Sequence, residues 1–169
     1  MLDPKSTVMI EDARIVFRNF AGREGPMNRE GDRNFGVLLE PGLAEAMLRD
    51  GWNVKYLKGR EEGDADQPYI GVSVKYGKGR PPRVVTLTSR GRTELGEDEV
   101  EMLDWAEYKN VDLIFRPYNW NVGDKTGVKA YLKEIFVTLN ESELDLKYSN
   151  IPEAKEPTPY ERDELTERA

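Results

Sequence analysis

The sequence predicts a mainly β domain, either a sandwich or a small antiparallel barrel, with one or two short helices. Six or seven short segments are rich in β-branched and aromatic residues, and Gly, Pro and Asn turns separate them at short spacing. Only one or two segments show the spacing of an amphipathic helix. The 169 residues suffice for one domain with a buried core. A five-stranded barrel with an inserted helix and an extra hairpin accommodates every segment.

The elements of the N-terminal half are identified by the period of their apolar residues. Trp52, Val54 and Tyr56 alternate with polar residues, as in a half-buried strand. Apolar residues at positions 43, 44, 47 and 48 repeat with helical spacing, which predicts a short helix that ends near Gly51. The expected elements are strands at 8–20, 34–39, 52–56 and 70–76 and a helix at 43–49.

The C-terminal half contains two long β-like runs that favour a hairpin. Residues 111–120 and 129–139 flank the segment 121–127, whose Gly-Asp pair and second Gly suit a hairpin loop. A shorter strand is expected at 84–88, and the acidic segment 96–108 is expected to form a helix or a structured loop. These patterns do not reveal the order of the strands.

The charge distribution indicates an acidic tail and a basic internal stretch. The whole chain has a net charge of −7. Residues 141–169 hold nine acids and four bases, a net of −5, whereas residues 69–93 hold six bases and no acid. The last roughly twenty residues are rich in Pro and Glu and have little to bury, which predicts disorder. We therefore expect a folded domain at 1–148 and an acidic, disordered tail at 149–169.

The composition argues against catalysis. The chain has no Cys and no His, which removes thiolate nucleophiles, His acid–base chemistry and the usual zinc sites. The acidic clusters at 64–66 and 97–101 lie in expected loops or on a polar helix face, where solvated carboxylates are the simplest interpretation. We expect no enzymatic activity, no cofactor and no metal. Without a signal stretch or an apolar run of 18 residues, a cytoplasmic protein with no membrane span is expected.

Basic and aromatic residues share one face of three expected strands. In 111–120, two-residue periodicity places Arg116, Tyr118 and Trp120 on the side opposite the core residues. A cation next to a ring recurs in 129–139 and in 8–20. Such a combination binds single-stranded nucleic acid without sequence preference, because cations hold the phosphates while rings stack on bases. The candidate contacts are Arg18, Phe20, Arg33, Lys75, Arg80, Arg83, Arg90, Arg116, Tyr118, Trp120, Lys129 and Tyr131.

The competing interpretation is that the rings belong to the core and the cations are solvated edges, because aromatic residues are mostly buried. On that basis four rings are assigned to the core. They are Phe17, Trp52, Phe115 and Phe136.

Several long motifs resemble those of phage single-stranded-DNA-binding proteins. They are RNFAGREGPMNREGDRNFGVLL from Arg18, DGWNVKYLK from Asp50, LDWAE from Leu103, and VDLIFRPYNW from Val111 followed by GVKAYLK. The resemblance covers about residues 8–148. It implies an OB-like antiparallel β-barrel with one or two short helices and an extra β-hairpin. It also implies binding of single-stranded DNA in phage replication or recombination, and an acidic tail that recruits replication or recombination proteins. The tail departs from the better-known pattern, because no apolar or aromatic residue closes its acidic run.

The leading hypothesis is therefore sequence-independent binding and protection of single-stranded DNA. One alternative is a structural or protein-interaction component, such as an inhibitor or a virion component, that binds no nucleic acid. Another is a strand-annealing recombination mediator, which would use the same face to hold two strands. A homo-oligomer is compatible with each of them.

Overall fold

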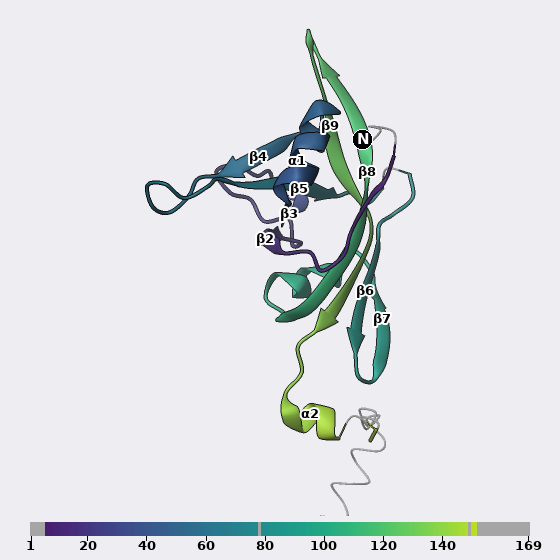
Figure 1. Cartoon of the computed structure of the whole chain (residues 1–169). Helices are drawn as coiled ribbons and strands as arrows, with labels where there is room; N and C mark the ends of the chain where they lie inside the picture. Colours follow the sequence, from purple (N-terminus) through teal and green to yellow (C-terminus); the bar gives the residue numbers. More distant parts are fainter. Residues whose placement is uncertain (1–5, 78, 149, 152–169) are drawn as a thin grey trace, which may run out of the picture.

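A computed structural model describes residues 6–77, 79–148 and 150–151 (Figure 1). The helices are α1 (Pro41–Arg49), the 3-10 helix η1 (Val100–Asp104) and α2 (Glu143–Lys147). The strands are β1 (Val8–Ile10), β2 (Ile15–Asn19), β3 (Arg33–Leu38), β4 (Val54–Leu57), β5 (Gln67–Val74), β6 (Arg83–Thr88), β7 (Gly91–Leu95), β8 (Tyr108–Val122) and β9 (Lys125–Leu139).

The strands form one sheet in the order β1-β8-β9-β5-β3-β2, with β4 paired to β5 and the β6–β7 hairpin paired to β9. Most pairings are antiparallel, but β9 runs parallel to both β5 and β6. This confirms the predicted class, which is mainly β and OB-like. An OB fold in general is a partly open five-stranded barrel. Within the described residues, no ladder joins β1 to β2, so the sheet is not closed there.

The expected strand at 8–20 is wrong as a single element, because the chain changes partners in its middle. β1 pairs with β8 and β2 pairs with β3. Between them, Asp12 adopts a positive φ of 51°, and the Ala13 N–H donates to the Val111 carbonyl at 2.8 Å. The polar pair Glu11-Asp12 thus marks a bend that carries the chain from one end of the sheet order to the other.

A second irregularity lies inside β2, where the register shifts between Val16 and Asn19 and Phe17 has a φ of 51°. It reverses the two-residue alternation on which the sequence argument relied. Phe17, assigned to the core, is 59% exposed. Phe20, assigned to the outer face, is fully buried and stacks on Phe35 with ring centroids 5.0 Å apart.

The core lies between the inner faces of β3, β5, β8 and β9 and is capped by α1, which contributes Ala44 and Met47. The core assignments of Trp52 and Phe115 are confirmed, since they are 2% and 0% exposed. Phe136 is half-buried, with the guanidinium of Arg83 lying 5.3 Å from its ring centroid.

The two hairpins of the C-terminal half point to opposite ends of the molecule (Figure 1). The β8–β9 hairpin extends through most of the expected loop 121–127, because β8 continues to Val122 and β9 begins at Lys125. The strand β7 was not predicted, since four of its five residues are exposed and give no apolar pattern. The expected segment 96–108 contains the short helix η1. Apart from residues 150–151, the expected tail 149–169 lies outside the described residues, and its disorder stays a prediction.

Candidate nucleic-acid interface

A groove of about 380 Å³ lies on the outer face of the sheet, opposite the core. Its floor contains small and polar residues of β3 and β5, among them Asn34, Gly71 and Ser73. One wall is the loop that joins β2 to β3, here named the 20–32 loop, and the other is formed by β9 and the start of β4. We name it the outer groove. Its lining residues are Met27, Asn28, Asp32, Arg33, Asn34, Asn53, Lys55, Gly71, Ser73, Lys75, Lys129 and Tyr131.

Two stacked tyrosines border the outer groove. The rings of Tyr118 on β8 and Tyr131 on β9 are 4.6 Å apart and nearly parallel, at 7°. Tyr131 is 7% exposed, whereas Tyr118 covers it and is 44% exposed. Burial raises the pKa of Tyr131, so its phenol stays neutral at physiological pH. Tyr118 therefore presents one aromatic surface to solvent, supported from beneath by Tyr131.

A β-bulge in β9 places Tyr131 on this face and Ile135, four residues later, in the core. Ile114 pairs with Glu134 but Phe115 pairs with Leu132, which leaves Lys133 without a partner in the ladder. The extra residue changes the side to which alternate residues point. In a regular strand, Tyr131 and the buried Ile135 would point to the same face because they are four residues apart. The bulge explains why they do not.

A second aromatic pair lies further along the same face. Phe17 contacts Tyr69 edge to face, with centroids 5.5 Å apart. Gly36 on the intervening strand leaves room for it, since a Cβ there would lie 2.9 Å from Val16 Cγ2 and 3.3 Å from Phe17 Cδ2. Tyr69 precedes Ser73 by four residues on β5, which corresponds to about 13 Å. Because Ser73 pairs with Tyr131, the two aromatic pairs lie about this far apart along β5.

Four cations and one acid line the outer groove. Lys55 and Lys129 are exposed, and neither forms an ion pair with any residue that the structure describes. Lys75 lies 3.5 Å from the carboxylate of Asp32. Arg33 donates to the Phe20 carbonyl at 2.6 Å, a neutral partner that leaves its charge uncompensated. The groove therefore carries a local positive charge although the chain is acidic overall.

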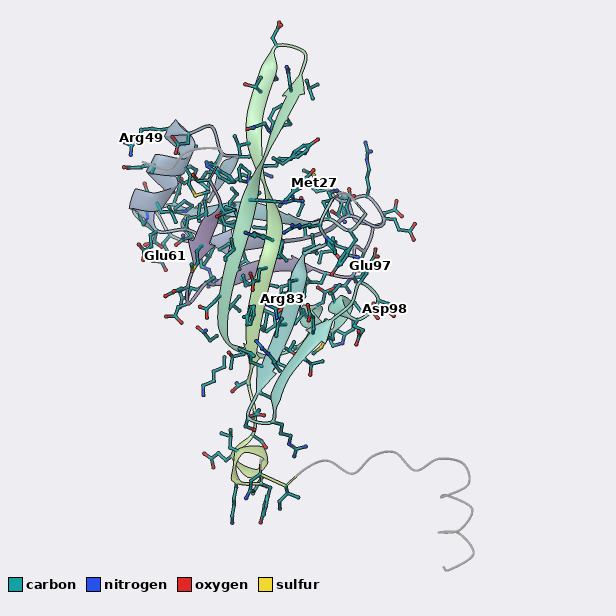
Figure 2. The ribbon with its side chains drawn as sticks, turned by 90° about the vertical axis from the view of Figure 1, so that its right-hand side faces the viewer. Met27, Arg49, Glu61, Arg83, Glu97 and Asp98 are labelled. Carbon is teal, nitrogen blue, oxygen red and sulfur yellow. The ribbon has the colours of Figure 1, made fainter. Side chains whose placement is uncertain are left out.

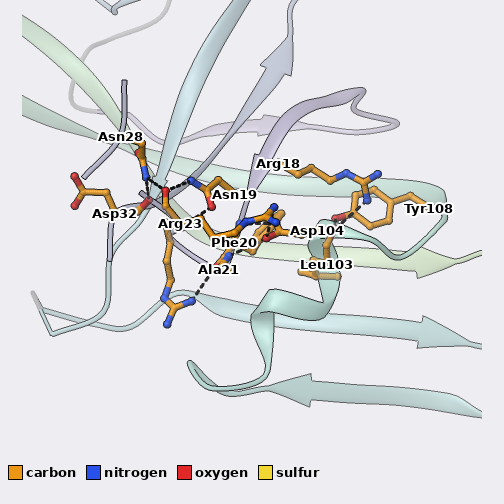
Figure 3. A network of polar contacts seen from close by, with 11 residues as sticks. Arg18, Asn19, Phe20, Ala21, Arg23, Asn28, Asp32, Leu103, Asp104 and Tyr108 are labelled. Carbon is orange, nitrogen blue, oxygen red and sulfur yellow. Dashed lines mark hydrogen bonds and ion pairs between the residues drawn. The ribbon is translucent and has the colours of Figure 1, made fainter. Parts of the chain in front are cut away.

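The 20–32 loop is fixed to the body of the protein by Asp104, the last residue of η1 (Figure 3). The side chain of Asp104 is 1% exposed and accepts hydrogen bonds from the N–H groups of Phe20 at 2.6 Å and Ala21 at 3.1 Å. Arg23 adds an ion pair at 3.6 Å. The loop then projects beside the β8–β9 hairpin, where Figure 2 shows Met27 and Arg49 on opposite sides of that hairpin.

Arg18, a predicted contact, is used to hold the chain together instead. Its guanidinium donates to the carbonyls of Leu103 at 3.0 Å and Ala106 at 2.7 Å and lies 4.6 Å from the ring centroid of Tyr108 (Figure 3). The β2 irregularity turns this side chain towards the segment 103–108, away from the outer groove. The Tyr108 hydroxyl donates to the Leu103 carbonyl as well.

This packing predicts a loss of stability in alkaline solution. Burial, the largest effect, raises the pKa of Tyr108 to about 12. An unfolded tyrosine ionises near pH 10, so between pH 10 and about 12 only the unfolded state gains from ionisation. The free energy of unfolding should be insensitive to this group below pH 10 and should fall above it. Urea unfolding at pH 9, 10 and 11 measures the effect, and Tyr108→Phe should show a smaller fall over the same range.

The structure brings six predicted contacts to the outer groove or its tyrosine border. They are Arg33, Lys75, Arg116, Tyr118, Lys129 and Tyr131. Arg116 belongs here because it is paired with Tyr131 across the β8–β9 ladder. Trp120 lies further out on the hairpin, half-buried, with its ring against Gly127.

The other predicted contacts lie elsewhere. The assignment of Phe20 is wrong, because the ring is completely buried. Arg83 forms ion pairs at 3.3 Å with both Glu94 and Glu134, which neutralise it. Arg80 is exposed in the segment between β5 and β6, outside the groove lining. Arg90 occupies the β6–β7 turn, at the end of the molecule away from the β8–β9 tip (Figure 1).

Sequence reasoning missed three residues of this face. Lys55 alternates with Val54 and Tyr56, and that alternation already placed it on the polar side of a strand. Tyr69 begins the acid-free stretch 69–93. Phe17 carried no comparable signal, because only the irregular backbone of β2 exposes it.

Two further properties of the described part of the chain concern metal binding and membrane spanning. No group of three or more acidic residues is placed so that it could hold a metal ion. No described helix combines the length and the apolar character needed to cross a membrane.

Comparison with known proteins places these features in a family. The family model described as "Putative phage ssDNA-binding domain" matches residues 2–166. No curated protein matches the chain. Two solved structures of the single-stranded DNA-binding protein from bacteriophage Enc34, the second in complex with ssDNA, are similar at 11% identity and a TM-score of 0.52. Each match covers 80% of this chain, and 82% and 88% of those chains respectively. This likeness shows a shared fold, while the family match covers nearly the whole sequence. The chain belongs to the family of phage ssDNA-binding domains.

Proposed function

We propose that this chain binds and protects single-stranded DNA without sequence preference during phage DNA replication or recombination, in the cytoplasm of the host cell and without catalysing a reaction. The observation that carries the proposal is the stacked pair Tyr118–Tyr131 beside a groove with the uncompensated cations Lys55 and Lys129. Rings that accept any base and cations that hold the phosphates are the two requirements for such binding.

The geometry supports a path along the outer groove. One base stacks on the exposed side of Tyr118, and another contacts the Phe17–Tyr69 pair. The roughly 13 Å between these positions along β5 corresponds to two or three nucleotides. Lys55, which pairs with Tyr69, and Lys129, which pairs with Tyr118, line the groove and contact the phosphates of this strand. The acidic tail at 149–169 is proposed to recruit replication or recombination proteins, and the proposal leaves room for a homo-oligomer.

The first experiment is a titration of the full chain with an oligo-dT of about 30 nucleotides, in low salt and in high salt. Binding that weakens with salt is the expected result. No binding in low salt would contradict the proposal. Parallel titrations with duplex DNA and RNA test the preference for single-stranded DNA. A strand-annealing assay distinguishes the proposed function from that of an annealing mediator.

Replacing both Lys55 and Lys129 with alanine is expected to reduce the salt dependence of binding. Two phosphate contacts are lost, so the slope of log K against log salt should decrease in magnitude by about 1.4. The matched control is Arg49→Ala with Arg92→Ala, which removes two exposed cations from α1 and β7, outside the groove lining. An equal change in both double variants would show that only net charge matters and would exclude this groove as the binding site.

A further inference from the structure

A second cleft, of about 650 Å³, lies where the sheet is open between β2 and the start of β8. We name it the seam cleft. Its walls are residues 13–16 and Arg18 on one side and residues 105–111 on the other, with Leu38 and Asn140 at the edges. None of these residues except Arg18 figured among the predicted contacts.

The seam cleft is positively charged. Arg14, Arg18 and Lys109 line it, against one acid, Glu107. Arg18 donates to two carbonyl oxygens and lies over an aromatic ring, so no carboxylate among these contacts cancels its charge. Arg14 and Lys109 are exposed, and neither is paired with an acid in the described part of the chain. Two cationic side chains are thus available to an anion at this position.

An exposed tryptophan stands in the same cleft. Trp105 follows η1 directly and is 64% exposed, whereas Trp52 is 2% exposed and lies in the core. Most aromatic side chains in the described part of the chain are at least half-buried, so packing does not explain an indole on the surface. Exposed cations and an exposed ring that line one cleft repeat the combination found at the outer groove.

The two sites are continuous along the outer face. Val16 lines the seam cleft and also packs against Gly36, next to Phe17. Leu38, another lining residue, is the partner of Tyr69 in the β3–β5 ladder. The seam cleft therefore begins where the Phe17–Tyr69 pair ends, and no separate binding event is needed to reach it.

We propose that a single strand longer than the outer groove continues past Phe17 and Tyr69 into the seam cleft, where Arg14 and Lys109 contact phosphates and Trp105 stacks on a base. This inference rests on the proposed function and extends its site. The inference predicts that single strands bind in two ways, depending on their length. A short strand occupies the outer groove alone, and a longer strand of the same sequence occupies both.

The test compares oligo-dT of about 5 and about 15 nucleotides, which span the site sizes of single OB folds. In the full chain, Arg14→Ala with Lys109→Ala should weaken binding of the longer strand about tenfold and reduce its salt slope by about 1.4. Binding of the short strand should not change. The control double variant Arg49→Ala with Arg92→Ala should leave both strands unaffected. Thermal melting confirms that these surface variants are folded.

Trp105 supplies a second readout. The longer strand should quench more tryptophan fluorescence than the short one, and Trp105→Phe should abolish the difference. Equal binding of the longer strand by the wild type and the Arg14/Lys109 variant would overturn the inference. The inference would also be overturned if the Arg14/Lys109 variant bound single strands normally but failed to anneal complementary strands. The seam cleft would then hold a second strand. If the wild type binds neither oligonucleotide, the proposed function itself fails, which is a different outcome.

Discussion

Replacing Tyr118 with alanine should weaken binding of single-stranded DNA by about 5- to 150-fold, the range given by one stacked base at about 1–3 kcal/mol. The ring is 44% exposed and lies on Tyr131 rather than in the core, so the domain should stay folded. Removing it takes away the stacking surface and uncovers Tyr131, whose own ring is too recessed to replace it. Fluorescence titration with oligo-dT measures the loss, and circular dichroism measures the fold.

Two variants make this prediction specific. Tyr118→Phe keeps the ring and should bind nearly as well as the wild type. Tyr56→Ala removes a tyrosine that is 47% exposed on β4, where it pairs with the buried Pro68 rather than facing the outer groove, and it should not change affinity. Wild-type affinity in Tyr118→Ala would place the DNA elsewhere on the molecule.

Replacing Asp104 with alanine should lower the free energy of unfolding by roughly 2–4 kcal/mol, because the N–H groups of Phe20 and Ala21 lose their acceptor in a buried position. Arg23 loses its ion pair as well, but its side chain is 66% exposed and this loss counts for little. The free 20–32 loop no longer holds its wall of the outer groove, so affinity for single-stranded DNA should fall too. Urea unfolding and oligo-dT titration measure the two effects.

The matched control is Glu101→Ala, which removes an exposed carboxylate from the same 3-10 helix. It should change neither stability nor affinity appreciably. Asp104→Asn, which keeps one acceptor oxygen, should lie between the wild type and the alanine variant. If Asp104→Ala and Glu101→Ala unfold at the same urea concentration, the carboxylate does not anchor the loop.

Local patterns in the sequence identified β3, α1, β5, β6 and the β8–β9 hairpin, because each has a clear apolar period and a turn at its ends. They also placed Arg116 and Tyr118 on the outer face, where β8 alternates without interruption from Val111 onward. The same rule failed at Phe17 and Phe20, since an irregular backbone in β2 breaks the two-residue period on which it depends.

The sequence by itself determined the class of fold, the family and the kind of chemistry, because β periodicity, long motifs and the pairing of cations with rings are all local properties of the chain. Only the tertiary structure decided which cations face the groove. Lys55 and Lys129, 74 positions apart, meet there through pairings of β4 and β9 with β5. Arg18 and Arg83 are instead engaged by carbonyl oxygens and carboxylates. Whether a charged side chain is available to a ligand depends on its neighbours in space, and neighbours distant in sequence leave no local pattern.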